Sequence, residues 1–198
     1  MKVFDGLQLV GGHAALDFLN TVEYRGRPQS GDRLASFEAL ARWSAAAGLI
    51  SENDLTAVLA SSARSPRAAR ALHSAIELRE ALYAVVVARI RGTPLPPDAS
   101  RIVERQLRNA RATADLHYEA SGSCFAWQIP IQRAGDVVIR LAASADTLLL
   151  SIHSVAVQQC QGPQCDWLFV DRSHGHRRLW CQPTKCGNIV RVRRSRAR

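Results

Sequence analysis

Four cysteines near the C-terminal end form two pairs with the same internal spacing. Cys160 and Cys165 make the first pair, Cys181 and Cys186 make the second, and fifteen residues separate the two pairs. Each short spacing lets a loop turn two thiolates toward one point, and the intervening segment is long enough to run out and back. Four sulfurs can then surround one tetrahedral Zn²⁺ ion. The spacing therefore predicts one structural zinc ion held by these four cysteines.

The same cysteines could serve other purposes, and each alternative conflicts with a feature of the sequence. Disulfides need an oxidising compartment, but the N-terminal stretch has Asp5 and two glycines where a signal peptide needs an unbroken apolar run. A catalytic zinc ion usually has three protein ligands and an open position, whereas four sulfurs close the shell. His153, His174 and His176 lie near enough to replace a cysteine as a ligand. Because no nucleophile–base pair or phosphate-binding loop is present, we do not expect an enzyme.

Positive charge is concentrated in the stretch that contains these cysteines. The whole chain has a formal net charge of +9. Between Cys160 and Arg198, nine Lys or Arg side chains stand against only Asp166 and Asp171, a formal +7 that leaves +2 for the rest of the chain. Such a cluster attracts the phosphate backbone of nucleic acids. The residues that we expect to contact duplex DNA are Arg177, Arg178, Lys185, Arg191, Arg193 and Arg194.

A hairpin is predicted between the two cysteine pairs. Residues 167–171 have the pattern of a strand, 173–175 that of a turn, and 178–180 that of the returning strand. With a metal-binding knuckle before the hairpin and a helix after it, the order of elements is treble-clef-like. Residues 154–160 could instead form a strand that leads into the first cysteine pair.

A helix should follow the second pair and begin near Cys186. Ile189 and Val192 are its apolar positions, and we expect them to face back toward the hairpin. Positions three or four apart lie on one face of a helix. One face should therefore carry Arg191, Arg194 and Arg198. In a DNA groove, such arginines can contact guanine edges as well as phosphates.

A polar face interrupts the first predicted helix, which spans residues 13–22. Because positions one turn apart share a face, four polar side chains should lie together: His13, Asp17, Asn20 and Thr21. They could line a small-molecule pocket, or they could form a buried hydrogen-bond network that ties the helix to the following loop. Both interpretations bury the face at least partly, because the neighbouring positions are apolar. In the basic loop 24–33, Arg25 and Arg27 are either contacts for an anionic effector or solvated charges.

The remainder of the N-terminal part reads as mainly helical. Capping residues, glycine stops and apolar positions at helical spacing predict helices at 36–47, 51–60, 65–91, 99–114 and 139–154. Between 116 and 138 the period changes, and a short β-hairpin is expected beneath or beside the helices. No apolar run approaches the roughly 18–20 residues of a membrane span. We therefore expect a cytoplasmic protein with no membrane segment.

These elements define the predicted fold class as mainly α with a small β-hairpin (α+β). A helical N-terminal domain should occupy residues 1–155, and a treble-clef-like four-cysteine zinc module should occupy residues 156–198. A module of fewer than about 40 residues cannot normally bury a sufficient core without a metal or disulfides. Loss of zinc should therefore unfold the module and leave the helical domain largely intact.

The C-terminal stretch resembles the CGNR zinc fingers, which are bacterial modules. Their pattern is approximately C…C…LFxD.S…RRWC…CGNR followed by a basic run. The chain departs from this pattern where Leu179 separates the arginine pair from Trp180, and where Ile189 replaces the name-giving arginine. The second departure removes one phosphate or base contact. The matching residues are Cys160, Cys165, Leu168, Phe169, Val170, Asp171, Ser173, Arg177, Arg178, Trp180, Cys181, Cys186, Gly187 and Asn188.

A second motif extends the resemblance to the N-terminal half. Residues 16–21, LDFLNT, match the LDFxNT motif that opens the helical domain of stress-induced bacterial transcription regulators carrying this finger. The resemblance implies a transcription regulator that binds duplex DNA through the zinc module. Its N-terminal domain would sense a ligand or mediate assembly, so a small-molecule effector and a homodimer are further expected partners.

A zinc-stabilised RNA-binding or protein-interaction module is the alternative from another class. Trp167, Phe169 and Trp180 support it, because aromatic side chains can stack on unpaired bases. In so small a module, the same residues can also be the only core available. Competition between duplex DNA and structured RNA at two salt concentrations would separate the two hypotheses.

Overall fold

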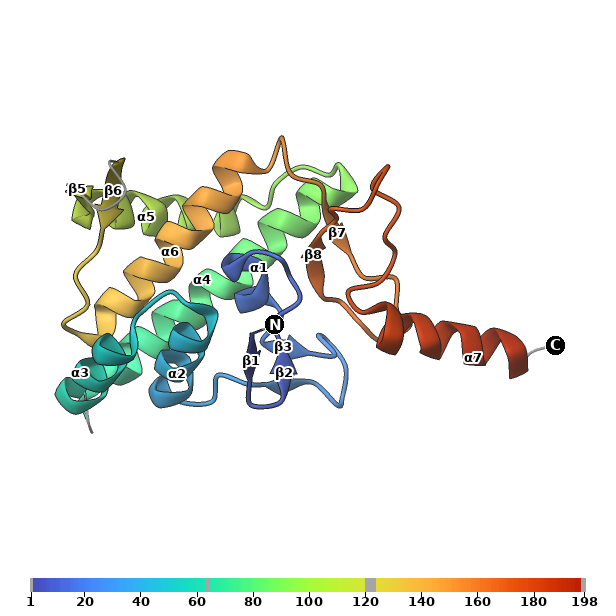
Figure 1. Ribbon diagram of the computed structural model, residues 1–198, viewed down its shortest axis with the longest axis horizontal. Helices are drawn as coiled ribbons and strands as arrows, with labels where there is room; N and C mark the ends of the chain where they lie inside the picture. Colours follow the sequence, from blue (N-terminus) through green and yellow to red (C-terminus); the bar gives the residue numbers. More distant parts are fainter. Residues whose placement is uncertain (1, 63–64, 120–123, 197–198) are drawn as a thin grey trace.

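The computed structural model describes residues 2–62, 65–119 and 124–196, which form a helical body with a C-terminal extension (Figure 1). The helices are α1 (Ala14–Leu19), α2 (Phe37–Ala47), α3 (Glu52–Ser62), α4 (Pro66–Arg91), α5 (Pro97–Thr113), α6 (Ala134–Ser151), the π-helical turn η1 (Pro183–Gly187) and α7 (Asn188–Arg196). The strands of this part of the chain form antiparallel pairs: β1 (Val3–Phe4) with β2 (Leu7–Gln8), β3 (Val22–Glu23) with β4 (Gly31–Asp32), β5 (Asp115–Glu119) with β6 (Cys124–Gln128), and β7 (Val157–Gln159) with β8 (Leu168–Val170). The predicted class, mainly α with a small β-hairpin, is confirmed, and the described structure has several small antiparallel strand pairs.

Local signals set both ends of α2 and α4 and the start of α3 as the sequence predicted, whereas α3 ends at Ser62 rather than near residue 60. Ser36 Oγ accepts a hydrogen bond from a first-turn amide of α2 at 3.1 Å, and Gly48 ends that helix with φ of +79°. At the start of α3, Ser51 Oγ accepts from the amide of Asp54 at 3.1 Å, and the Asp54 carboxylate accepts from the Ser51 amide at 3.0 Å. Because such caps replace the missing intrahelical partners, they can be recognised without the fold. The last predicted helix begins earlier, at Ala134 rather than 139.

The long helix α4 is the spine of the body. It packs against α5 and α6, and its side chains Leu78, Leu82 and Val86 are fully buried. The short helix α1 lies against both α4 and α6 and also against strand β8 of the C-terminal extension (Figure 1). Its Phe18 ring lies 5.5 Å from the ring of Trp43 on α2. The helix that carries the LDFLNT motif is therefore central to the fold.

That first helix is shorter than predicted. Helix α1 ends at Leu19, and Val22 begins β3, which pairs with β4 in the loop 24–33 that was expected to be irregular. Val22 fits a helical period and is buried, so the period alone could not separate a helix from a strand. The carbonyl of Thr21 instead accepts a hydrogen bond from the amide of Arg33 at 3.0 Å, which turns the chain into the strand pair.

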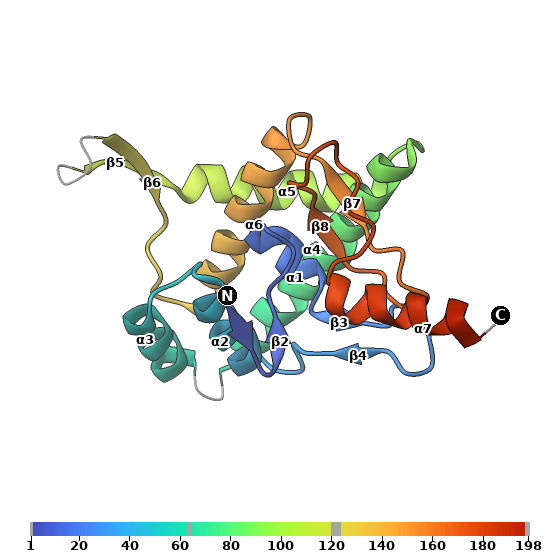
Figure 2. The ribbon, with the colours of Figure 1, turned by 45° about the vertical axis from the view of Figure 1, so that its right-hand side comes forward.

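The hairpin β5–β6 forms where a hairpin was expected, beneath or beside the helices, and the helices do not cover it. It projects from the body beyond α5 and α6 (Figure 2). Its four large apolar side chains are more than half exposed: Leu116, Tyr118, Phe125 and Trp127. The change of period at this point indicated the strands, but nothing local could indicate whether the body would cover them.

The strand pairing in the C-terminal extension also differs from the first prediction. Strand β8 pairs with β7, which precedes the first cysteine pair, and not with residues 178–180. The alternative strand within 154–160 is therefore the correct one. Residues 178–180 form no strand and make one backbone bond to the knuckle, from the Gln161 amide to the Leu179 carbonyl at 2.9 Å.

Strand β8 also belongs to the core of the helical body. Leu168 and Val170 are buried in the same cluster as the α1 and α4 side chains. The division of the chain into residues 1–155 and 156–198 stays a prediction, and the described structure has packing across it. Among the described residues, no helix is both long and apolar enough to span a bilayer.

Candidate metal centre and its link to the helical core

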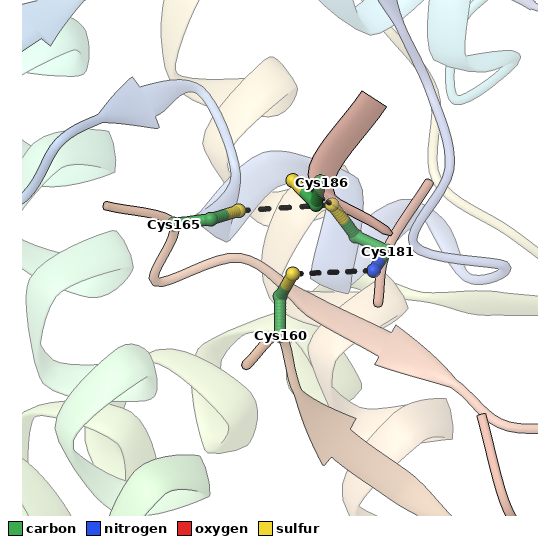
Figure 3. Close-up of side chains that lie close together, drawn as sticks. All are labelled: Cys160, Cys165, Cys181 and Cys186. Atoms are coloured by element: carbon green, nitrogen blue, oxygen red, sulfur yellow. Dashed lines mark hydrogen bonds between the residues drawn. The ribbon is translucent and has the colours of Figure 1, made fainter. Parts of the chain in front are cut away.

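The four predicted ligands converge on one point. Their sulfur atoms all lie within 4.8 Å of one another, and their side chains point toward a common centre (Figure 3). Cys181 Sγ lies 3.6 Å from Cys165 Sγ and 3.7 Å from Cys186 Sγ. Four sulfurs at about 2.3 Å from a tetrahedral zinc ion lie about 3.8 Å apart, whereas a disulfide needs about 2.05 Å. The geometry fits one zinc ion and not a disulfide.

Backbone groups orient the first ligand. Cys160 Sγ accepts hydrogen bonds from the amides of Cys181 at 3.3 Å and Gly162 at 3.4 Å. A side chain at Gly162 would place its Cβ 3.1 Å from Cys165 Cβ and 3.2 Å from Cys186 Sγ, which is closer than ordinary van der Waals contact, so glycine suits this position of the knuckle. Bonds of this kind hold a thiolate in position for a metal.

The thiols strongly affect one another's ionisation. Hydrogen bonds from the thiols of Cys165 and Cys181 lower the pKa of Cys160. The interaction with Cys160 in turn raises the pKa of Cys165 and of Cys181, and burial raises that of Cys186. Because four thiolates this close repel one another, the full set ionises together only around a cation. A divalent ion is therefore what this set of donors is suited to hold.

The segment before the second cysteine pair is held by Asp171 and Arg178. The buried carboxylate of Asp171 accepts hydrogen bonds from the Ser173 amide at 2.9 Å, the Ser173 hydroxyl at 2.7 Å and the Arg178 amide at 2.9 Å. The Arg178 guanidinium lies 4.3 Å over the Phe169 ring and donates to the carbonyls of Trp180 and Cys181. Arg178 was expected to contact DNA, but its described contacts are within the module.

The asparagine of the LDFLNT motif joins the helical body to the zinc module. Asn20 Nδ2 donates to the Leu168 carbonyl at 2.9 Å, and the Leu168 amide donates to Asn20 Oδ1 at 2.8 Å. The side-chain amide thus pairs with β8 as a neighbouring strand would. The Val170 amide donates to the Gly11 carbonyl at 2.8 Å, next to this pair. Leu168 and Val170 of β8 are therefore both hydrogen-bonded to the segment around α1.

The threonine of the motif belongs to a buried charge network. Arg79 on α4 is 2% exposed, and its guanidinium donates to Thr21 Oγ1 at 3.0 Å and to the Asp32 carboxylate at 2.8 and 2.6 Å. Burial opposes ionisation of Asp32, but the Arg79 guanidinium and the hydrogen bond from the Leu34 amide together lower the pKa of this carboxyl below its usual value. No local pattern pointed to Arg79, because its partners lie 47 and 58 residues away.

The other two polar residues of the predicted face also bond to protein groups. His13 caps α1 by accepting from the Ala15 amide at 3.2 Å, and Asp17 Oδ1 accepts from the Gly11 amide at 2.7 Å. Asp17, Asn20 and Thr21 are each buried. These contacts support the buried-network interpretation, and a ligand pocket at this face stays a prediction.

The pKa of Asp17 gives the network a testable pH dependence. Burial raises this pKa from 3.8 to about 6, so the folded chain binds the proton more tightly than the unfolded chain. The stability from this group is therefore fully present below pH 3.8 and is lost as the pH rises through about 6. Asp17→Asn keeps an oxygen for the Gly11 amide and removes the titration. Relative to this variant, the free energy of unfolding of the native chain should fall by about 2 kcal/mol between pH 4 and 7. Chemical denaturation of both chains measures this difference, and a difference independent of pH would contradict the assignment.

The arginines of loop 24–33 are also engaged within the protein. The Arg25 guanidinium lies 4.1 Å over the Tyr83 ring and donates to the Leu19 carbonyl at 2.8 Å. Arg27 Nη1 lies 3.4 Å from Asp166 Oδ2 in the zinc module. They are therefore not freely solvated charges, because both side chains tie the loop to neighbouring elements. A contact with an anionic effector stays a prediction.

The basic helix α7 extends away from the body (Figure 1). Ile189 and Val192, which were predicted to face back toward the hairpin, are 47% and 48% exposed, so neither is a core position. Arg198 lies outside the described residues. The predicted DNA contacts with exposed side chains are Arg177, Lys185, Arg191, Arg193 and Arg194.

Comparison with known protein families agrees with both halves of this arrangement. Residues 12–151 match the family model ABATE, described as a putative stress-induced transcription regulator. Residues 157–198 match the CGNR zinc finger. No curated protein matches the chain. The resemblance inferred from LDFLNT and from the four cysteines is confirmed, and the convergent sulfurs form one structural zinc site.

Proposed function

Because the chain belongs to the ABATE family of putative stress-induced transcription regulators, we propose that it binds duplex DNA through its zinc module and α7. The observation that carries this proposal is the form of α7. The sequence of this helix, NIVRVRRSR, has no acidic residue, and none of its side chains is fully buried. Among the described residues, no ion pair includes an arginine of α7. These arginines are therefore available for phosphates.

The metal centre fixes the end of this helix that is nearer the body. Cys186 lies in the turn η1, and this turn directly precedes α7. An α-helix of about 10–12 Å diameter fits the major groove of B-DNA, which is about 12 Å wide. Arg191 and Arg194 are three residues apart and share one face. Zinc would therefore set the direction in which these two side chains meet the duplex.

The RNA-binding alternative has weaker support. Of its three aromatic residues, Phe169 is fully buried beneath the Arg178 guanidinium, and Trp180 lies against Gly187. Base stacking requires an accessible ring face. The burial of Phe169 favours a core role for at least this residue.

A regulatory input would enter through the helical body. The pair between Asn20 and Leu168 is the direct bond from the family motif to the zinc module. An effector that shifts α1 would act on β8 and on the ligand loop that β8 follows. A regulator of this kind would work in the bacterial cytoplasm, where the chromosome is located.

The proposal predicts that DNA affinity depends on α7. In the double variant Arg191→Ala/Arg194→Ala, loss of two phosphate contacts should reduce the magnitude of the negative slope of log affinity against log salt by about 2. Loss of base contacts should instead cost about 1–3 kcal/mol on the cognate site alone. Fluorescence anisotropy with duplex DNA at several salt concentrations measures both effects, with structured RNA as competitor.

A matched variant separates position from charge. Arg101→Ala/Arg108→Ala removes two exposed arginines of α5 and should leave the salt slope nearly unchanged.

Ile189→Arg should strengthen binding, because this side chain is half exposed at the position of the family arginine. If the zinc-loaded α7 variant binds DNA as the native chain does, or if RNA wins the competition at every salt concentration, the proposed function is wrong.

A further inference from the structure

The hairpin β5–β6 presents an apolar face that the body does not cover. Alternate residues of a strand lie on the same side, and Leu116 and Tyr118 of β5 stand directly opposite Trp127 and Phe125 of β6. All four side chains therefore share one face, which we call the aromatic face. Their exposed fractions are 51%, 60%, 65% and 69% in that order. The rings of Tyr118 and Phe125 lie 5.4 Å apart, so the face is continuous.

The opposite face of the same hairpin is different. It carries Asp115, His117 and Gln128, which are exposed and polar. Polar side chains commonly face solvent. Three neighbouring aromatic rings that face solvent are unusual, because burying them would stabilise the protein. An isolated two-stranded hairpin is also marginally stable in water. The aromatic face is therefore the side on which this hairpin needs a partner.

The size and composition of this face identify the partner. With about 200 Å² for each large side chain, its exposed area is roughly 500 Å², at the upper end for the largest apolar patch of a monomer. Two such faces would bury roughly 1,000 Å² together, which reaches the lower limit for a specific interface. The face has no charged side chain, so it offers no complementarity to an acidic or basic partner. An apolar face of this kind can match its own copy across a two-fold axis.

We propose that the aromatic face binds the same face of a second copy of this chain, which makes the protein a homodimer through β5–β6. The hairpin and α7 lie at opposite ends of the molecule in both views (Figures 1 and 2). Dimerisation therefore leaves both basic helices free and far from each other. If α7 binds DNA as proposed above, each copy would engage its own site, and one dimer could bridge two duplexes.

Hydrodynamic measurement of the zinc-loaded full chain tests the dimer without DNA. Sedimentation velocity from about 1 to 100 μM should show a reversible monomer–dimer equilibrium for the native chain. Trp127→Glu should raise the dimer dissociation constant at least about 30-fold, since tryptophan is a frequent centre of binding energy. His117→Glu, which places the same charge on the opposite face, should leave it within about threefold. Circular dichroism checks that both variants are folded.

Phe125→Glu provides a second variant in case Trp127→Glu does not fold. A native chain that stays monomeric at 100 μM would overturn the proposal and assign the aromatic face to a different partner. Dimers that persist in a folded Trp127→Glu or Phe125→Glu chain would also overturn it, because another surface would then hold the copies together. DNA binding enters none of these measurements, so this test can fail while the proposed function stands.

Discussion

Cys181→Ser should remove the zinc ion and destabilise the whole chain, not only its C-terminal module. The Cys181 thiol lies 3.6 and 3.7 Å from two other sulfurs, and the Cys181 amide also donates to Cys160 Sγ. In small zinc-binding modules the metal contributes about 10–16 kcal/mol of apparent binding free energy that appears as folding free energy. A module without the ion should therefore unfold.

The structure changes the expected extent of this unfolding. From the sequence, the helical body was expected to remain largely intact. Leu168 and Val170 of β8, however, are buried in the main core, and Asn20 is bonded to Leu168. Unfolding of β8 would expose the side of α1 that it covers and leave the Asn20 amide without its partners. We therefore expect the melting temperature of the helical body to fall as well.

Zinc content per chain and thermal melting by circular dichroism measure both parts of this prediction. Cys124→Ser is the matched control, because Cys124 is the one cysteine of the chain outside the predicted ligand set. It should retain one zinc ion per chain. Full zinc occupancy in Cys181→Ser would refute the ligand assignment. A helical body that melts at an unchanged temperature after zinc loss would refute the shared core.

Asn20→Ala should have the second largest effect. The substitution leaves the buried amide and carbonyl of Leu168 without partners, and each unpaired buried group costs about 1–3 kcal/mol. A total loss of about 2–5 kcal/mol in the free energy of unfolding follows. Asn20→Asp should also be strongly destabilising, because a carboxylate oxygen would replace the amide group that donates to the Leu168 carbonyl.

Zinc release to a chelator provides a second measurement on the same variants. Strand β8 directly follows the loop that holds Cys165, so loosening β8 should speed the loss of zinc from Asn20→Ala. Asn109→Ala removes an exposed asparagine of α5 and should change stability by less than about 0.5 kcal/mol. If Asn20→Ala matches that control in both stability and zinc release, then the motif does not couple the two halves of the chain.

Much of the metal centre was determined by the sequence alone. Two CxxxxC spacings identified Cys160, Cys165, Cys181 and Cys186, because loop closure depends on residues only a few positions apart. The same holds for the caps at Ser36 and Ser51 and for the extent of α4. In both caps the side chain and the backbone group that it binds lie within one helical turn, so a short stretch of sequence is enough to recognise the interaction.

Only the tertiary structure decided the features that join distant segments. Asn20 and Leu168 are 148 residues apart, and Arg79 meets Asp32 across 47 residues. The same limit explains why the sequence could not show that Arg178 is bonded within the zinc module or that the β5–β6 hairpin is exposed. Charge and period describe what a residue can do, but the packing of other segments determines whether its side chain meets a protein group, a partner or water.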